Sequence, residues 1–117
     1  MSFRLIYLAR RNPAVPFDEW PRTWRSHAVY VSQFPAMGVA VDRVIYCARM
    51  ADVPAGYARE YDGVALVDSA SKETLRGSMA PDVRALVDTD ELRVFSKPVD
   101  DFSLYTDEIA ACGAGAG

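Results

Sequence analysis

His27, the single histidine of this chain, lies in a segment whose apolar residues recur with helical spacing. With residues 17–34 taken as a helix at about 100° per residue, His27 falls on the same apolar stripe as Trp20 and Trp24. The rest of the stripe is formed by Phe17, Ala28, Val31 and Phe34. An imidazole titrates near neutrality, so it can remove a proton next to a carbonyl or from a phenol. Because a core-facing imidazole needs a hydrogen-bond partner, His27 is either a general acid–base group in a pocket or a satisfied structural residue.

A histidine that works as a base needs a group that orients its ring. Asp62 is the first candidate, because it stands at the entry of a predicted strand beside the expected pocket. The alternative for Asp62 is an ordinary turn or edge carboxylate. Asp90 and Glu91 are weaker candidates, since an acidic pair near the end of a helix is most often solvated.

Several aromatic and basic residues are candidates for substrate contacts. Trp24 is either a substrate platform or a core residue. Tyr7 and Tyr46 lie on predicted strands that line the sheet interior, where a phenol can bind a substrate oxygen, although cross-strand packing explains them equally well. Arg4 and Arg49 are strand residues that could hold a carboxylate, with solvation at the strand ends as the alternative.

Composition and motifs exclude several classes of protein. Half of the 117 residues are hydrophobic, a quarter are charged, and the net charge is −3 without a basic block, so nucleic acid is not an expected partner. No apolar run approaches the roughly 20 residues that span a bilayer, and we expect neither a membrane anchor nor a signal peptide. No zinc-ligand spacing or phosphate-binding loop occurs, so we expect no metal and no cofactor. Cys47, expected in the core, and Cys112 form no disulfide framework, which suits the cytoplasm.

The order of predicted elements is β-α-β-β-α-β. Strands are predicted at 2–9, 41–50, 61–68 and 102–109, and helices at 17–34, 71–79 and 81–92. This order is typical of an α+β, ferredoxin-like domain with a four-stranded antiparallel sheet. We assign the domain to residues 1–110 and a flexible, glycine-rich C-terminal tail to residues 111–117.

Two of the predicted strands, 2–9 and 61–68, are apolar on both faces. An antiparallel sheet with one solvated face alternates between polar and apolar residues. Two helical regions cover one face of the sheet, so the other face needs a cover of its own. A second copy of the same sheet supplies it, which predicts a homodimer.

Three short motifs together resemble the EthD family of the dimeric α/β-barrel superfamily, over about residues 3–109. Phe17, Trp24 and His27 share one helix, Tyr61-Asp62-Gly63-Val64 begins a strand, and Asp90-Glu91 is followed by Phe95. The family often has an aromatic residue where this chain has Thr23, and Trp20 can supply that bulk from one turn earlier.

The resemblance implies ferredoxin-like subunits whose sheets pack face to face into a dimeric α/β barrel. Members and neighbours of the family include proteins of ether catabolism and cofactor-free decarboxylases, cyclases and isomerases of aromatic or lactone intermediates. Quinone-forming monooxygenases occur in the wider superfamily.

The residues and the resemblance together predict a cofactor-independent lyase, decarboxylase or isomerase. Its substrate is a small oxygenated aromatic or alicyclic molecule, with His27 as general acid–base and Asp62 as its partner. A cofactor-free monooxygenase that uses the same pocket is one alternative. A non-enzymatic ligand-binding or accessory protein, in which His27 is structural, is the other.

Overall fold

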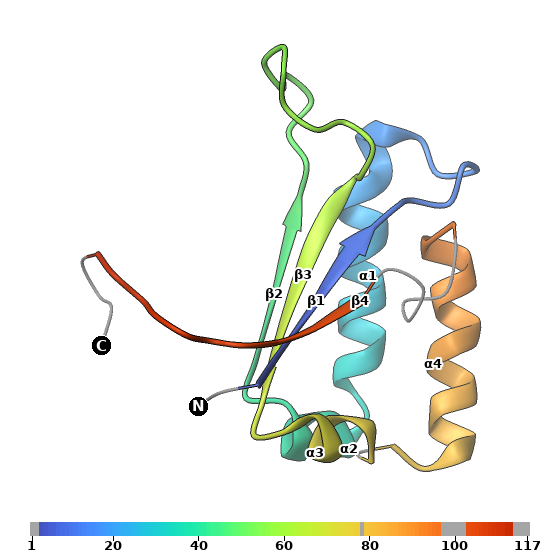
Figure 1. The fold of residues 1–117 in the computed structure, drawn as a ribbon. Coiled ribbons are helices and arrows are strands. Elements are labelled where there is room, and N and C mark those ends of the chain that lie inside the picture. Colours follow the sequence, from blue (N-terminus) through green and yellow to red (C-terminus); the bar gives the residue numbers. More distant parts are fainter. Residues whose placement is uncertain (1–2, 78, 97–102, 114–117) are drawn as a thin grey trace.

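A four-stranded antiparallel sheet packs against the helices through one of its faces (Figure 1). The computed structural model of the chain describes residues 3–77, 79–96 and 103–113. The strands are β1 (Phe3–Ala9), β2 (Arg43–Ala48), β3 (Gly63–Ser69) and β4 (Ser103–Asp107), in the spatial order β2-β3-β1-β4. The helices are α1 (Trp20–Ser32), α2 (Pro35–Ala40), α3 (Lys72–Arg76) and α4 (Pro81–Val94), and one 3₁₀ turn, Phe17–Glu19, precedes α1. The predicted α+β ferredoxin-like fold is confirmed.

The sheet register decides which side chains face the helices. Tyr7 of β1 stands opposite Ala65 of β3, and Ala65 stands opposite Tyr46 of β2. These three residues therefore point to the same face of the sheet, because side chains alternate along each strand. Ala65 and Tyr7 belong to a buried cluster with Trp24 and Phe95, so this is the face that the helices cover.

Helix α1 has the rotational phase that its sequence predicts. Trp20, Trp24, His27 and Val31 are its buried residues. The predicted helix 17–34 is nevertheless divided into two pieces, the 3₁₀ turn Phe17–Glu19 and α1, and α1 has no side-chain cap at its N-terminus. Helix α1 ends before residue 34, which is extended because it precedes a proline, and α2 begins at that proline.

The second helical region is also divided as predicted. Ser71 caps α3 by accepting a hydrogen bond from the main-chain N–H of Thr74 at 3.0 Å. Helix α3 ends at Arg76, three residues earlier than predicted, and α4 continues to Val94, two residues beyond the predicted end. Of the predicted tail, residues 111–113 have no regular secondary structure, and residues 114–117 lie outside the described residues.

The opposite face of the sheet is aliphatic and has no helix on it among the described residues (Figure 1). Ile45, Leu66, Ile6 and Leu104 stand side by side across β2, β3, β1 and β4, and we call these four residues the open-face row. Cys47 lies on this face as well and is exposed, so the expectation of a core cysteine was wrong. The reason is the alternation of β2, which turns Tyr46 toward the helices and Cys47 away from them.

Candidate functional site

A cavity of about 150 Å³ lies between the sheet and the helices α1, α3 and α4. Five residues singled out from the sequence line it: Tyr7, Trp24, His27, Tyr46 and Glu91. Helix α4 contributes Glu91 to the lining. Phe95, the residue that follows α4, lines the cavity beside His27, and the centroids of the two rings are 5.6 Å apart. Most of the other lining residues are apolar, so the site is an apolar pocket with a few polar groups, as ligand sites usually are.

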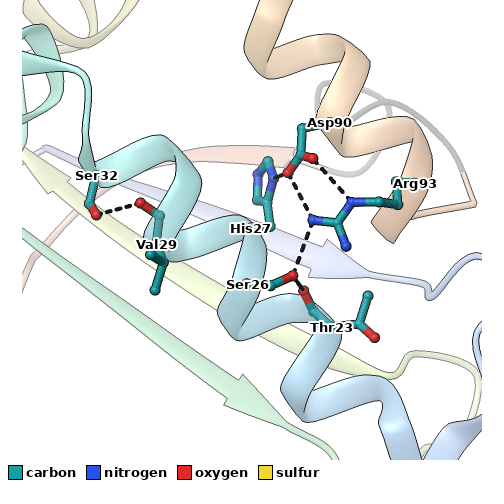
Figure 2. Close-up of polar contacts among 7 residues, drawn as sticks. All are labelled: Thr23, Ser26, His27, Val29, Ser32, Asp90 and Arg93. Carbon is teal, nitrogen blue, oxygen red and sulfur yellow. Dashed lines mark hydrogen bonds and ion pairs between the residues drawn. The ribbon is translucent and has the colours of Figure 1, made fainter.

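Asp90 of α4 is the hydrogen-bond partner of His27, as Figure 2 shows. The distance from His27 Nδ1 to Asp90 Oδ2 is 2.7 Å, and the histidine is only 6% exposed. A carboxylate only accepts hydrogen bonds, so Nδ1 carries the proton and Nε2 keeps its lone pair. The ring is therefore fixed in the tautomer that a base requires.

Asp90 is itself held by Arg93, one turn further along α4 (Figure 2). Arg93 Nε lies 3.1 Å from Asp90 Oδ1, and Arg93 Nη2 lies 3.2 Å from Asp90 Oδ2. The same Nη2 donates to Ser26 Oγ at 3.1 Å, and Ser26 donates to the carbonyl of Thr23 at 2.6 Å. This chain of contacts links α1 to α4 and fixes the carboxylate that orients His27.

The electrostatic surroundings favour a neutral His27 beside an ionised Asp90. Burial lowers the pKa of His27 below its ordinary 6.5 and outweighs the hydrogen bond and negative charge of Asp90, while the charge of Arg93 lowers the pKa further. Burial would raise the pKa of Asp90, but the hydrogen bonds from Arg93 and His27 prevail and hold it below the ordinary value. The imidazole is thus in its basic form at neutral pH.

Two polar atoms of the cavity lining are buried without a hydrogen-bond partner in the described part of the chain. They are the Tyr7 hydroxyl oxygen and Trp24 Nε1. Burial, reinforced by the negative charge of Glu91, raises the pKa of Tyr7, and the same causes raise the pKa of Tyr46. Both phenols remain protonated at neutral pH and are available as donors. Buried donors without an acceptor are costly, and an oxygen atom of a ligand would satisfy them.

Asp62 is not the partner of His27, which corrects the sequence-based hypothesis. Its carboxylate accepts a hydrogen bond from the main-chain N–H of Arg11 at 2.9 Å and lies 3.7 Å from Arg49 Nη2. Its main-chain carbonyl accepts from Trp20 Nε1 at 2.9 Å. Asp62 therefore ties the ends of β1 and β2 to α1, and it is not among the residues that line the cavity.

The helical pattern of α4 contains a signal that points to Asp90. Asp90 is three residues beyond Val87 and four before Val94, and both valines are buried. Positions with this spacing share one side of a helix. This spacing places the Asp90 carboxylate on the buried side of α4, where it can reach His27, and not on the solvated surface of the helix end.

The two strand arginines considered for a carboxylate lie away from the cavity. Arg4 pairs with Asp68 on the open face, with 2.6 Å between Arg4 Nε and Asp68 Oδ1. Arg49 stacks over the ring of Phe17, 4.5 Å from its centroid. The arginines that do line the cavity are Arg76 and Arg84, neither of which was singled out from the sequence.

The described residues show neither a metal-binding cluster nor a membrane-spanning helix. No three of their histidine, cysteine, aspartate or glutamate side chains gather in a group that could hold a metal ion. None of the helices in residues 3–77, 79–96 and 103–113 has the length and apolar character needed to cross a membrane.

Comparison with known proteins identifies the fold. No family model matches the sequence, and no curated protein matches it. The structure is similar to that of an EthD family protein from Bacillus halodurans C-125, with a TM-score of 0.63 at 18% identity, over 93% of this chain and 100% of that one. It is also similar to a dimeric ferredoxin-like protein of unknown function from Thermobifida fusca YX, with a TM-score of 0.60 at 18% identity, over 91% and 90% of the two chains. HapK from Hahella chejuensis matches with a TM-score of 0.58 at 12% identity, over 98% and 99%.

This chain has the ferredoxin-like fold of these proteins. The solved structures that it resembles include an EthD family protein, in agreement with the motifs of the sequence. A shared fold does not define a shared reaction, so function has to be inferred from the cavity.

Proposed function

We propose that the protein is a cofactor-independent enzyme in which His27 transfers a proton on a small oxygenated aromatic or alicyclic molecule. The hydrogen bond between His27 Nδ1 and Asp90 carries the proposal, because it leaves the basic Nε2 to a ligand. The lining of the cavity by His27, Tyr7 and Trp24 supports it. A lyase, a decarboxylase or an isomerase would each use such a group.

The proposed step is a proton transfer next to a carbonyl or from a phenol. Nε2 of His27 takes the proton, and the electron pair of the broken bond moves onto the substrate oxygen. Asp90 stabilises the imidazolium that forms, as a carboxylate does beside a catalytic histidine. The hydroxyl of Tyr7 is a donor for the developing negative charge. The proton then returns to the product, so the step is balanced without an oxidant or reductant.

We also propose that the protein forms a homodimer through the open-face row. The similar protein from Thermobifida fusca is described as dimeric, and the row presents four aliphatic side chains that no described helix covers. Obligate homodimer interfaces usually bury more than about 2,000 Å² in total, and the face of a four-stranded sheet is a suitable surface for one.

Deuterium exchange tests the proton transfer before a natural substrate is known. Phenolic, lactone and β-keto acid compounds are incubated with the protein in deuterated water, and enzyme-dependent incorporation or loss of carbon dioxide is followed by NMR. The variant His27→Gln keeps a side chain of similar size, and we expect it to lower the rate about 10²–10⁴-fold. The variant Arg22→Gln, on the exposed side of α1, is the control and keeps the full rate.

Three results would contradict the proposed function, and each would indicate a different role for the protein. A His27→Gln protein with the full rate would make the histidine structural. Compounds that bind with no turnover would identify a ligand-binding or accessory protein. Consumption of oxygen with an electron-rich phenol would identify a cofactor-free monooxygenase that uses the same cavity.

A further inference from the structure

The cavity has two chemically different ends, and α4 runs along both. Arg84, Val87 and Glu91 all line the cavity from this helix. Arg84 precedes Glu91 by seven residues, which is about 10 Å along the axis of an α-helix. Glu91 is the sequence neighbour of Asp90, the partner of His27. The arginine therefore stands about two helical turns from the proton-transfer end.

The arginine end of the cavity includes side chains that are exposed to solvent. Tyr105, which lines the cavity beside Arg76, is 47% exposed, and the side chain of Arg84 is 42% exposed. His27 and Trp24 at the other end are 6% and 2% exposed.

Contacts at the arginine end hold one guanidinium group in place. Arg76 Nη1 donates to the Tyr105 hydroxyl at 2.7 Å, and the guanidinium lies 5.9 Å from the centroid of the same ring. A guanidinium has five N–H donors and binds carboxylates in a forked geometry. Arg84 places a second positive charge on the same lining and also pairs with Asp88, with 2.9 Å between Arg84 Nε and Asp88 Oδ1.

We propose that the cavity binds a single-ring aromatic carboxylic acid, with its carboxylate at Arg76 and Arg84 and its oxygenated end at His27. This inference deepens the proposed function, on which it depends for the reactive end. The volume of about 150 Å³ is that of an apolar cavity that admits benzene. The apolar residues between the two ends enclose the ring.

A matched pair of probes tests the carboxylate. We choose 3-(4-hydroxyphenyl)propionate and its neutral isostere 3-(4-hydroxyphenyl)propionamide, and measure their affinities by calorimetry and by quenching of tryptophan fluorescence. We expect the wild-type protein to bind the acid about 10–100-fold more tightly than the amide. This ratio corresponds to the usual free energy of a hydrogen bond to a charged group. The double variant Arg76→Gln/Arg84→Gln loses this preference and keeps its affinity for the amide. Arg22→Gln is the matched surface control and keeps the preference.

Equal affinities of the wild-type protein for the two probes would overturn the inference. So would the absence of saturable binding of the acid, or a preference that survives in the double variant. His27→Gln separates this inference from the proposed function, because it leaves the preference for the acid intact while it stops proton exchange. A preserved preference together with unimpaired exchange in His27→Gln would disprove the proposed function and leave the carboxylate site standing.

Discussion

The two faces of the sheet differ in the kind of partner that they can bind. The covered face combines aromatic packing with polar groups, and it encloses a cavity lined by Tyr7, Trp24 and His27. The open face presents the aliphatic row across all four strands, flanked by the ion pair of Arg4 with Asp68. A cavity with convergent polar groups suits a small ligand. A broad aliphatic surface suits another protein surface.

This difference separates two kinds of effect. A substitution on the open face should change assembly and reach the cavity only through the loss of the dimer. A substitution on the covered face should change stability or ligand binding and leave assembly intact. Variants placed on each face test whether the two functions are as separate as the structure indicates.

The largest effect is expected from a charge in the centre of the open face. Leu66→Glu places a carboxylate in the open-face row, where the dimer would bury it without a partner, at a cost of several kcal/mol. Sedimentation equilibrium should show a dimer for the wild-type protein and a monomer for the variant. Val29→Glu is the control, because residue 29 is 65% exposed on α1, and this variant should remain dimeric. A folded wild-type monomer at micromolar concentration would contradict the dimer.

The next largest effect is expected from removal of the indole at the centre of the covered face. Trp24 is 2% exposed, stacks on Trp20 with centroids 5.0 Å apart, and meets Tyr46 edge to face at 5.2 Å. Trp24→Ala should lower the free energy of unfolding by about 3–5 kcal/mol, measured by chemical denaturation. The dimer should persist below the unfolding midpoint. An unchanged midpoint would place the indole outside the core.

The phase of α1 was predictable from the sequence, because local periodicity determines which side of a helix is buried. Trp20, Trp24 and His27 recur with helical spacing, and all three are buried. The positions of the strands along the chain were predictable for the same reason. Helix α2 was missed, although it begins at Pro35, directly after the predicted helix 17–34, and proline favours the first turn of a helix.

The partner of His27 was not predictable by the same means, because it depends on how α1 and α4 pack. Asp62 and Asp90 are distant from His27 in the sequence, and no local pattern states which of them approaches the ring. The structure brings α1 and α4 together at Ser26, His27 and Arg93. Arg76 and Arg84 were missed for a related reason, since they line the cavity only after α3 and α4 fold against the sheet.

A smaller effect is expected from a single methyl group beside Trp24. A Cβ atom at Gly63 would lie 2.5 Å from the main-chain oxygen of Cys47 and 2.5 Å from the Trp24 ring. Gly63→Ala should therefore destabilise the protein by about 1–3 kcal/mol through overpacking. Gly38→Ala is the matched control: its Cβ meets nothing within 4 Å, and alanine favours the helix α2. Thermal unfolding should show a lower midpoint for the first variant and an equal or higher one for the second.

The smallest effect is expected from the loss of the Arg93 charge on α4, which should shift the pKa of His27 slightly. The positive charge of Arg93 lowers the pKa of His27, and its hydrogen bonds help to hold the pKa of Asp90 low. Arg93→Gln should therefore raise the pKa of His27. The shift should be small because the side chain of Arg93 is 50% exposed and solvent screens its charge. NMR titration measures it directly, since one histidine gives one set of ring signals, and Arg22→Gln should leave the titration unchanged.

The sign of the pH dependence follows from the lowered pKa of His27. His27 binds a proton near pH 6.5 in the unfolded chain and only at lower pH in the folded chain. The contribution of His27 to the free energy of unfolding is therefore fully present above about pH 6.5 and declines as the pH falls toward the folded pKa. The rate of a reaction that uses neutral His27 should likewise persist below pH 6.5 and fall with further acidification. Arg93→Gln should move the acidic limb of the rate profile to higher pH and weaken the loss of stability between the two pKa values. A pKa of His27 above 6.5 in the wild-type protein would contradict both expectations. The effect of Asp90 on this pKa would then exceed the effect of burial, and His27 would be largely protonated at pH 6.5.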